Sequence, residues 1–279
     1  MKPTQPFEFC GLTFKNRVMT ASGTYDPKTS VVDPNIFGAV VLKSATRTPR
    51  SGNNQPRIVE APCGMINRIG LENPGVDALL DKNEAFYATL ETNVIGSAAG
   101  ESVDDYEYII GKYDKGEAIK AIEVNVSCPN VEKGLVFGTN PDLICELFVA
   151  LRRITRKPLI AKMTPNVTNI TVLVKAALNA GVNAVCIANT LRGCWKNRKG
   201  DWVEGGYSGP GITPIILQMI RDVRKDLGNG PAIIGCGGIN SLRTAELFFE
   251  CGASAIQIGS CGFGNPLLAE EIVQSLQTA

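Results

Sequence analysis

A cysteine and two carboxamide side chains gather in one short segment, Asn125-Val126-Ser127-Cys128-Pro129-Asn130. The apolar run before it, residues 121–124, favours a β-strand, and Pro129 ends that strand and biases Cys128 toward extended backbone. A thiol in this place can act as a base. Asn125 and Asn130 offer paired hydrogen-bond donors and acceptors to a polar, planar ligand. A buried structural thiol beside a turn would give the same pattern, so this segment alone does not distinguish a catalytic cysteine from a structural one.

Composition excludes several classes of chemistry and of partner. The chain has no histidine, which excludes Ser-His-Asp and Cys-His catalysis and most catalytic zinc sites, and we expect no metal site. A net charge of +1 gives no electrostatic footprint for nucleic acid or for an anionic membrane. No stretch approaches the roughly 18 apolar residues of a membrane span. We therefore expect a small-molecule ligand or a protein partner.

The cysteines and the N-terminal segment bear on the cellular compartment. There are nine cysteines, an odd number scattered along the chain, and residues 1–6 lack the apolar core of a signal peptide. Reduced thiols in a cytoplasmic protein are the expected state.

The elements that must position these residues alternate between short apolar runs and amphipathic segments, with no linker between them. At 279 residues and 44% hydrophobic content, the chain suits a single domain over residues 1–279. We predict an α/β fold, a (β/α)8 TIM barrel, with a doubly wound open sheet as the alternative. The predicted strands are 18–21, 39–43, 88–94, 121–125, 159–162, 184–189, 232–235 and 255–258. The predicted helices are 141–155, 168–180, 214–227, 241–251 and 267–277, two of which end before a glycine, Gly181 or Gly252.

Polar residues and glycines accumulate where these strands end, which is where a barrel of this kind places its active site. Each of them alone has an ordinary structural explanation, such as a strand-end lysine or a turn glycine. Their recurrence at every strand favours a ligand site. The residues concerned are Ser22, Lys43, Ser44, Asn93, Asn125, Cys128, Lys162, Asn189, Thr190, Gly237, Gly238, Gly259 and Ser260.

Two late glycine clusters, residues 235–238 and 259–262, fit a phosphate site after the seventh and eighth strands, where bare backbone N–H groups can approach an anion. A phosphate site of this kind suggests a phosphorylated cofactor, either flavin mononucleotide (FMN) or pyridoxal phosphate. Lys162 could form a Schiff base with the latter. No acidic residue is obviously placed to hold a pyridinium nitrogen, whereas a lysine beside a flavin can stabilise the anionic reduced ring.

Several longer motifs carry a family resemblance over most of the chain. They include Thr20-Ala21-Ser22-Gly23-Thr24, Gly64-Met65-Ile66-Asn67-Arg68-Ile69-Gly70-Leu71-Glu72-Asn73-Pro74-Gly75, Asn125 to Asn130 and Pro165-Asn166-Val167-Thr168. With these motifs the chain resembles the catalytic subunit of the class 1 dihydroorotate dehydrogenases. The resemblance implies an FMN-bearing barrel that oxidises dihydroorotate to orotate in the synthesis of pyrimidines (UMP).

Carried over position by position, the resemblance assigns Cys128 as the general base while a hydride passes to FMN N5. It implies the substrate-binding residues Lys43, Asn67, Ile69, Gly70, Leu71, Asn125, Asn130, Asn189 and Thr190. It implies the FMN-binding residues Ala21, Ser22, Lys43, Ser44, Asn93, Asn125, Lys162, Ala188, Gly209, Gly237, Gly238, Gly259 and Ser260.

The electron acceptor is the remaining expectation. The Thr20 to Thr24 stretch and Asn189-Thr190 resemble the NAD-linked type 1B, whose catalytic subunit passes electrons to a separate subunit with FAD and an iron–sulfur cluster. This chain lacks the cysteine spacing for such a cluster. A homodimeric core is also expected. The fumarate-linked type 1A, a related FMN barrel acting on another dihydropyrimidine, and a degenerate barrel without activity stay open as alternatives.

Overall fold

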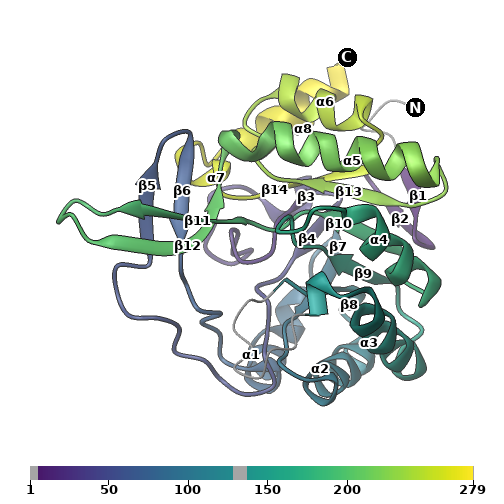
Figure 1. Cartoon of the computed structure of the whole chain (residues 1–279). Coiled ribbons are helices and arrows are strands. Elements are labelled where there is room, and N and C mark those ends of the chain that lie inside the picture. The colour runs from purple at the N-terminus through teal and green to yellow at the C-terminus, as the bar shows by residue number, and fades with distance from the viewer. Residues whose placement is uncertain (1–5, 128–136, 279) are drawn as a thin grey trace.

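The computed structural model describes residues 6–127 and 137–278, and its centre is a closed barrel of parallel strands (Figure 1). The strands follow one another around the barrel in chain order, and β14 pairs with β3 to close it. This confirms the predicted (β/α)8 barrel and excludes the open sheet. The barrel strands are β3 (Val18–Thr20), β4 (Ala39–Val41), β7 (Asn93–Ala98), β8 (Ile119–Asn125), β9 (Leu159–Lys162), β10 (Ala184–Ile187), β13 (Ile233–Cys236) and β14 (Ala255–Ile258).

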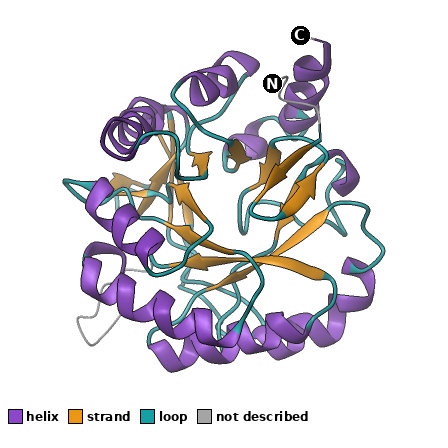
Figure 2. Ribbon diagram, turned by 90° about the vertical axis from the view of Figure 1, so that its right-hand side faces the viewer, coloured by secondary structure: helices purple, strands orange, loops and turns teal. Residues whose placement is uncertain are grey.

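Helices surround the strands (Figure 2). All five predicted helices are present, with ends that differ by at most two residues. Gly181 and Gly252 have positive φ, as expected of left-handed helix ends. The connection from β3 to β4 carries only a short 3-10 helix, η1 (Pro34–Ile36). The helices are α1 (Val76–Tyr87), α2 (Val103–Lys115), α3 (Pro141–Ile154), α4 (Ile170–Asn179), α5 (Thr213–Leu227), α6 (Leu242–Glu250), α7 (Cys261–Gly264) and α8 (Leu268–Thr278).

The third barrel strand is not where the sequence predicted it. Residues 88–92 follow the end of α1, where Ala88 N–H donates to the carbonyl of Glu84, and β7 begins only at Asn93. The strand continues through Gly96, Ser97 and Ala98, which are small residues of low strand propensity. The prediction of a strand at 88–94 is therefore wrong by about one strand length.

Aromatic side chains close the amino end of the barrel. The hairpin of β1 (Phe7–Phe9) and β2 (Leu12–Phe14) turns at Cys10 and Gly11, both with positive φ, as a two-residue hairpin turn requires. The rings of Phe7, Phe9 and Phe14 lie 5.6 to 5.8 Å apart and pack against the inward-facing barrel residues. This end of the barrel is filled, so a ligand has to enter from the other end.

A four-stranded antiparallel sheet extends from the carboxyl end of the barrel, to the left in Figure 1. It is built from the connections that follow β4 and β10, and the sequence analysis did not predict it. Short 3-10 helices, η2 (Phe137–Thr139) and η3 (Pro210–Ile212), precede α3 and α5. In spatial order the sheet strands are β11 (Leu191–Lys196), β12 (Trp202–Ser208), β6 (Gly64–Asn67) and β5 (Ile58–Ala61).

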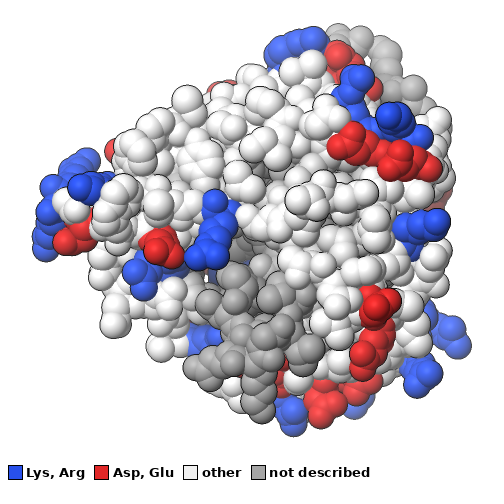
Figure 3. Space-filling view, in the orientation of Figure 1, with Lys and Arg blue, Asp and Glu red and all other residues white. Residues whose placement is uncertain are grey.

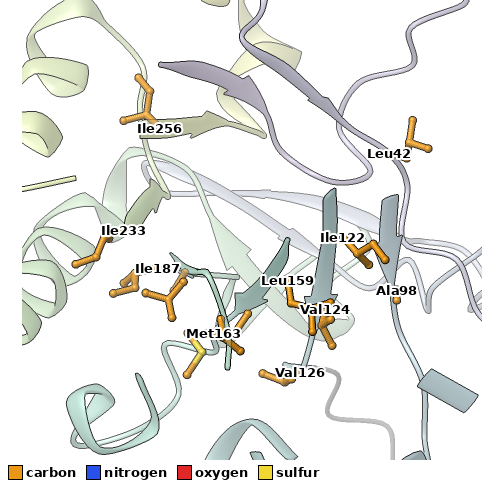
Figure 4. Close-up of a cluster of buried hydrophobic side chains, with 14 of the residues drawn as sticks. Leu42, Ala98, Ile122, Val124, Val126, Leu159, Met163, Ile187, Ile233 and Ile256 are labelled. Atoms are coloured by element: carbon orange, nitrogen blue, oxygen red, sulfur yellow. The ribbon is translucent and has the colours of Figure 1, made fainter. Parts of the chain in front are cut away.

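The main core lies between the barrel and the helices. Outward-facing strand residues such as Ile122, Val124, Leu159 and Ile187 are fully buried there (Figure 4). Burying one such side chain contributes about 1.5–3 kcal/mol. This core fixes the strand ends on which the site depends. In the described part of the chain, no helix combines the length and the apolar character that a bilayer crossing needs.

Candidate functional site

Two carboxamides from different strands meet at the carboxyl end of the barrel. Asn125 is the last residue of β8, and Asn189 follows β10. Asn189 Nδ2 donates to Asn125 Oδ1 at 3.2 Å and also to Ser127 Oγ, which itself donates to Asn125 Oδ1. The three side chains therefore hold one another in a fixed orientation, with Asn125 buried and Asn189 half-buried.

The antiparallel sheet brings Asn67 and Thr190 to the same region. Asn67 Nδ2 donates to the carbonyl of Gly206 at 3.2 Å. Thr190 packs against the same glycine, since a Cβ on Gly206 would lie 2.1 Å from Thr190 Oγ1. Asn166 holds the following turn, because its Nδ2 donates to the carbonyl of Thr190 at 3.2 Å.

Lys43 and Ser44 follow β4. The Lys43 side chain crosses Gly23, where a Cβ would lie 3.0 Å from its Cδ and 3.1 Å from its Nζ. Burial lowers the pKa of Lys43, and the negative charge of Glu72 opposes this in part. Ser44 Oγ shares a hydrogen bond of 2.8 Å with Ser97 Oγ on β7. A cation and two hydroxyls are thus available at this side of the barrel mouth.

The loop of Ile69, Gly70 and Leu71 is held by its backbone. Gly70 and Leu71 both have positive φ, and the Ile69 carbonyl accepts from the Asn53 N–H at 3.0 Å. The buried Asn73 fixes the end of the loop, since its Nδ2 donates to the Leu71 carbonyl at 2.7 Å and its Oδ1 accepts from the Thr46 N–H at 3.1 Å. Asn73 therefore ties this loop to the strand end that carries Lys43.

Glycines bring backbone segments together on the opposite side. A Cβ on Gly238 would lie 2.7 Å from the carbonyl of Gly209, so the loop after β13 touches the residue that follows β12. The Ala21 N–H donates to the Ile258 carbonyl at 2.9 Å, and a Cβ on Gly259 would lie 3.3 Å from that of Ala21. Ser22, Gly237 and Ser260 follow β3, β13 and β14. Ala188 follows β10, and its N–H donates to the Cys236 carbonyl.

A hollow of about 340 Å³ adjoins these glycines. It is lined by Thr20, Thr24, Gly259 and Gly262 together with apolar side chains that include Val32, Phe37 and Phe263, so its surface is mainly apolar.

Lys162 points into the barrel from the end of β9 and is buried. Its Nζ donates to Gln257 Oε1 at 2.6 Å and lies 3.8 Å from Glu123 Oε1. Burial alone lowers the pKa of Lys162, but Cys186, Cys236 and Glu123 around it outweigh this and raise the pKa above its ordinary value. A permanent positive charge therefore lies beneath the barrel mouth. Together with the glycines and hydroxyls above it, this charge fits a flavin, whose phosphate needs N–H donors and whose reduced ring carries negative charge.

Asn93 does not lie with the other predicted FMN-binding residues at the carboxyl end of the barrel. It begins β7, so it lies at the amino end of the barrel, opposite Ala39, and its Nδ2 donates to the carbonyl of Thr13 at 2.9 Å. The displaced strand prediction caused this error, and Asn93 is withdrawn as a cofactor residue. Ser97, four residues later, supplies the hydroxyl that contacts Ser44.

Two predicted residues, Cys128 and Asn130, lie outside the described residues. The structure brings in others that sequence reasoning did not select, namely Asn73, Ser97, Ser127 and Asn166. Asn73, Ser127 and Asn166 lie inside the quoted motifs, so their position there was the available signal. In the described ranges no three histidine, cysteine or acidic side chains gather as a metal site would require.

Comparisons with known proteins bear on this arrangement. The model of the dihydroorotate dehydrogenase family matches residues 6–279 of the chain. A relative from Pelobacter propionicus named dihydroorotate dehydrogenase B (NAD(+)), catalytic subunit, is 40% identical over 286 residues, which cover 99% of this chain and 93% of the relative. A protein of the same name from Carboxydothermus hydrogenoformans is 42% identical and covers 95% of this chain and 89% of its own length. A solved structure of DHODH from Eimeria tenella in complex with ferulenol has a TM-score of 0.84 over 99% of this chain and 84% of its own, at 20% identity, a likeness of fold alone.

Proposed function

The chain belongs to the dihydroorotate dehydrogenase family, and from this premise we propose that it oxidises dihydroorotate to orotate in pyrimidine biosynthesis. The observation that carries the proposal is the family match over residues 6–279, together with relatives of that name at about 40% identity. The polar groups at the carboxyl end of the barrel suit this substrate, because orotate is flat and bears one carboxylate and alternating C=O and N–H groups.

FMN is the proposed cofactor of a single domain over residues 1–279. Gly209, Gly237, Gly238, Gly259 and Ser260 would hold its phosphate side. Lys162 would lie beneath the ring, with Ala21, Ser22, Lys43, Ser44, Asn125 and Ala188 around it. When bound, FMN supplies a hydride acceptor. The chain has to supply the donors, the positive charge and a site closed to water.

The substrate would bind to carboxamides. Asn125 and Asn189 present donors and acceptors whose orientation is fixed by their mutual hydrogen bond. Asn67 and Thr190 are positioned around Gly206. Lys43 and the backbone of residues 69–71 would face the carboxylate end, and Asn130 completes the proposed set. Cys128 would remove the proton from C5, a role that depends on a thiolate.

We also propose how electrons leave the site. The relatives named as type B catalytic subunits support the NAD-linked class, in which a second subunit with FAD and an iron–sulfur cluster carries electrons onward. A homodimer of this chain would form the core of such a complex. All eight described cysteines are free thiols, which supports a reducing, cytoplasmic setting.

An anaerobic titration tests the proposal. The purified chain should be yellow with a flavin absorption band, and dihydroorotate should bleach the band while dihydrouracil and dihydrothymine should not. Bleaching by dihydrouracil or dihydrothymine would point to another dihydropyrimidine as the substrate. A colourless protein that takes up no added FMN would identify a barrel without this activity.

A further inference from the structure

Five polar side chains meet inside the barrel, below the proposed FMN site. They come from five successive strands, β8, β9, β10, β13 and β14, and at most 8% of any of them is exposed. We call Glu123, Lys162, Cys186, Cys236 and Gln257 the inner polar cluster. The sequence analysis assigned a role only to Lys162, and the proposed function uses none of the other four.

Gln257 connects the two charged members of the cluster. Its Oε1 accepts from Lys162 Nζ at 2.6 Å, and its Nε2 donates to Glu123 Oε2 at 2.7 Å. The other carboxylate oxygen, Glu123 Oε1, accepts no hydrogen bond from the described residues and lies 3.8 Å from Lys162 Nζ. Glu123 thus interacts with Lys162 by charge directly and by hydrogen bonds through Gln257.

The geometry leaves part of the ammonium group available. Lys162 Nζ has three N–H donors. One goes to Gln257 Oε1 and a second to Cys236 Sγ at 3.6 Å. For the third, Cys186 is the weak acceptor in the described part of the chain, and a ligand above the cluster can replace it.

A buried cation requires a nearby anion, and the cluster offers a carboxylate, that of Glu123, and a cysteine thiolate. Moving an unpaired charge into a barrel interior costs several kcal/mol. A hydrogen bond from Cys186 and the positive charge of Lys162 lower the pKa of Cys236 to about 7, whereas burial raises that of Cys186. The carboxylate of Glu123 lies 3.8 Å from Lys162 Nζ and is the anion that we assign to it, with the thiolate of Cys236 as its rival.

We propose that Glu123 is a positioning residue for the oxidation, which keeps Lys162 protonated and, through Gln257, aims its third N–H at the cofactor ring. The proposal rests on the proposed function in so far as that ring belongs to FMN. A protonated Lys162 balances the negative charge that two-electron reduction leaves on a flavin that has taken up one proton. Without Glu123 the lysine would rest as a neutral amine. Each reduction of the flavin would then take up two protons, one on the flavin and one on the amine.

The ion pair can be tested without any flavin. The variants Glu123→Gln, Lys162→Met and the double variant, all as apo-protein, form a cycle read by chemical denaturation. Glu123→Gln removes the counter-ion of Lys162, so folding at pH 7 must either bury an unpaired cation or remove its proton, and the unfolding equilibrium constant should rise at least about 100-fold. The double variant should recover most of this loss, because neither charge remains. Additive effects of the two substitutions would overturn the pairing.

The pH dependence of the same variants gives a second readout. In Glu123→Gln the folded-state pKa of Lys162 falls below its unfolded value of about 10.4. The unfolded state then binds more protons, so stability should rise as the pH increases from neutral toward about 10. Cys186 and Cys236 also face Lys162. The double variant is therefore the matched reference, because it differs from Glu123→Gln only by the loss of the lysine. An equal rise in the double variant would assign the effect to the thiols and overturn the proposal.

The flavin part is tested on the holoenzyme by its reduction potential. In the wild type one proton should accompany the two-electron reduction of the flavin, whereas in Glu123→Gln two protons should accompany it. The reduction potential of the variant should therefore fall about twice as steeply with pH as that of the wild type. Cys236→Ala should keep the wild-type slope. The opposite result, doubling in Cys236→Ala and none in Glu123→Gln, would make the thiolate the counter-ion and overturn the proposal. Failure of the wild type to bind FMN would overturn the proposed function, while the apo-protein cycle would still decide the ion pair.

Discussion

At the scale of single residues, the site relies on groups whose hydrogen bonding is fixed in advance. Asn125 Oδ1 accepts from Ser127 and Asn189, which leaves its amino group without a partner in the described part of the chain. A neutral carboxamide with a fixed orientation can recognise one edge of a planar ring without the desolvation cost of a charge. Among the described residues of the site, the positive charges are Lys43 at the mouth and Lys162 below it, and Lys162 is paired with Glu123. This separation suits a substrate whose only charge is a carboxylate.

Cys128 is the residue whose replacement tests the chemistry most directly. Cys128→Ala should lower turnover about 10² to 10⁴-fold, because the base is lost, and it should retain FMN, because no proposed phosphate or ring contact changes. Cys128→Ser should be partly active at raised pH, since a hydroxyl loses its proton less readily than a thiol. Stopped-flow measurement of flavin reduction by dihydroorotate separates these effects from product release. Wild-type rates in Cys128→Ala at neutral pH would place the base elsewhere.

At the scale of elements, close backbone contacts between loops shape the glycine region. The loop after β13 meets the residue after β12 at Gly238 and Gly209, and Thr213 Oγ1 at the start of α5 donates to the Gly238 carbonyl at 3.1 Å. A side chain at Gly238 would push these elements apart, because the nearest atoms include a backbone carbonyl that cannot rotate away. Two segments of the chain, residues 209–213 and the loop after β13, therefore depend on one missing Cβ.

Gly238→Ala should lower the free energy of unfolding by about 1–3 kcal/mol and weaken FMN binding, because its positive φ and its contacts both oppose a Cβ. Gly262→Ala is the matched control: a Cβ there has no atom within 4 Å, and the residue lies in α7. The control should unfold at or slightly above the wild-type temperature. Thermal unfolding and FMN content measure both. Equal stability of the two variants would contradict the close approach at Gly238.

The elements also show which patterns predict structure and which do not. Seven barrel strands were predicted near their positions because a parallel strand buried on both faces gives an unbroken apolar run. β7 was misplaced because its small residues, Gly96 to Ala98, lack that pattern. The four-stranded antiparallel sheet of β11, β12, β6 and β5, here called the outer sheet, was missed because β11 is largely exposed and β12 contains adjacent glycines, so neither strand alternates clearly. Glu123 and Gln257 interrupt apolar runs, and only the closed barrel shows that they meet.

At the scale of the whole molecule, the barrel is closed at one end and extended at the other. The aromatic hairpin fills the amino end, and inward-facing residues such as Met19, Ile95 and Ile160 fill the interior below the inner polar cluster. The outer sheet projects beyond the mouth and carries side chains of both charges at its tip (Figure 3). With its interior filled by its own side chains, the barrel leaves only its mouth for a ligand, and that is where we propose that FMN and the substrate bind.

The isolated chain should therefore reduce FMN with dihydroorotate but use NAD poorly until a subunit with FAD and an iron–sulfur cluster is added. No Gly-x-Gly-x-x-Gly turn opens a βαβ unit in this chain, so it lacks the usual backbone site for the pyrophosphate of NAD. Steady-state assays of the chain alone with NAD, with fumarate and with an artificial dye test this, and the dye is the control that the flavin itself turns over. Addition of the second subunit should raise the NAD rate and leave the dye rate unchanged. Rapid NAD reduction by the chain alone would contradict the need for a partner, and rapid fumarate reduction would assign the chain to the fumarate-linked type 1A instead.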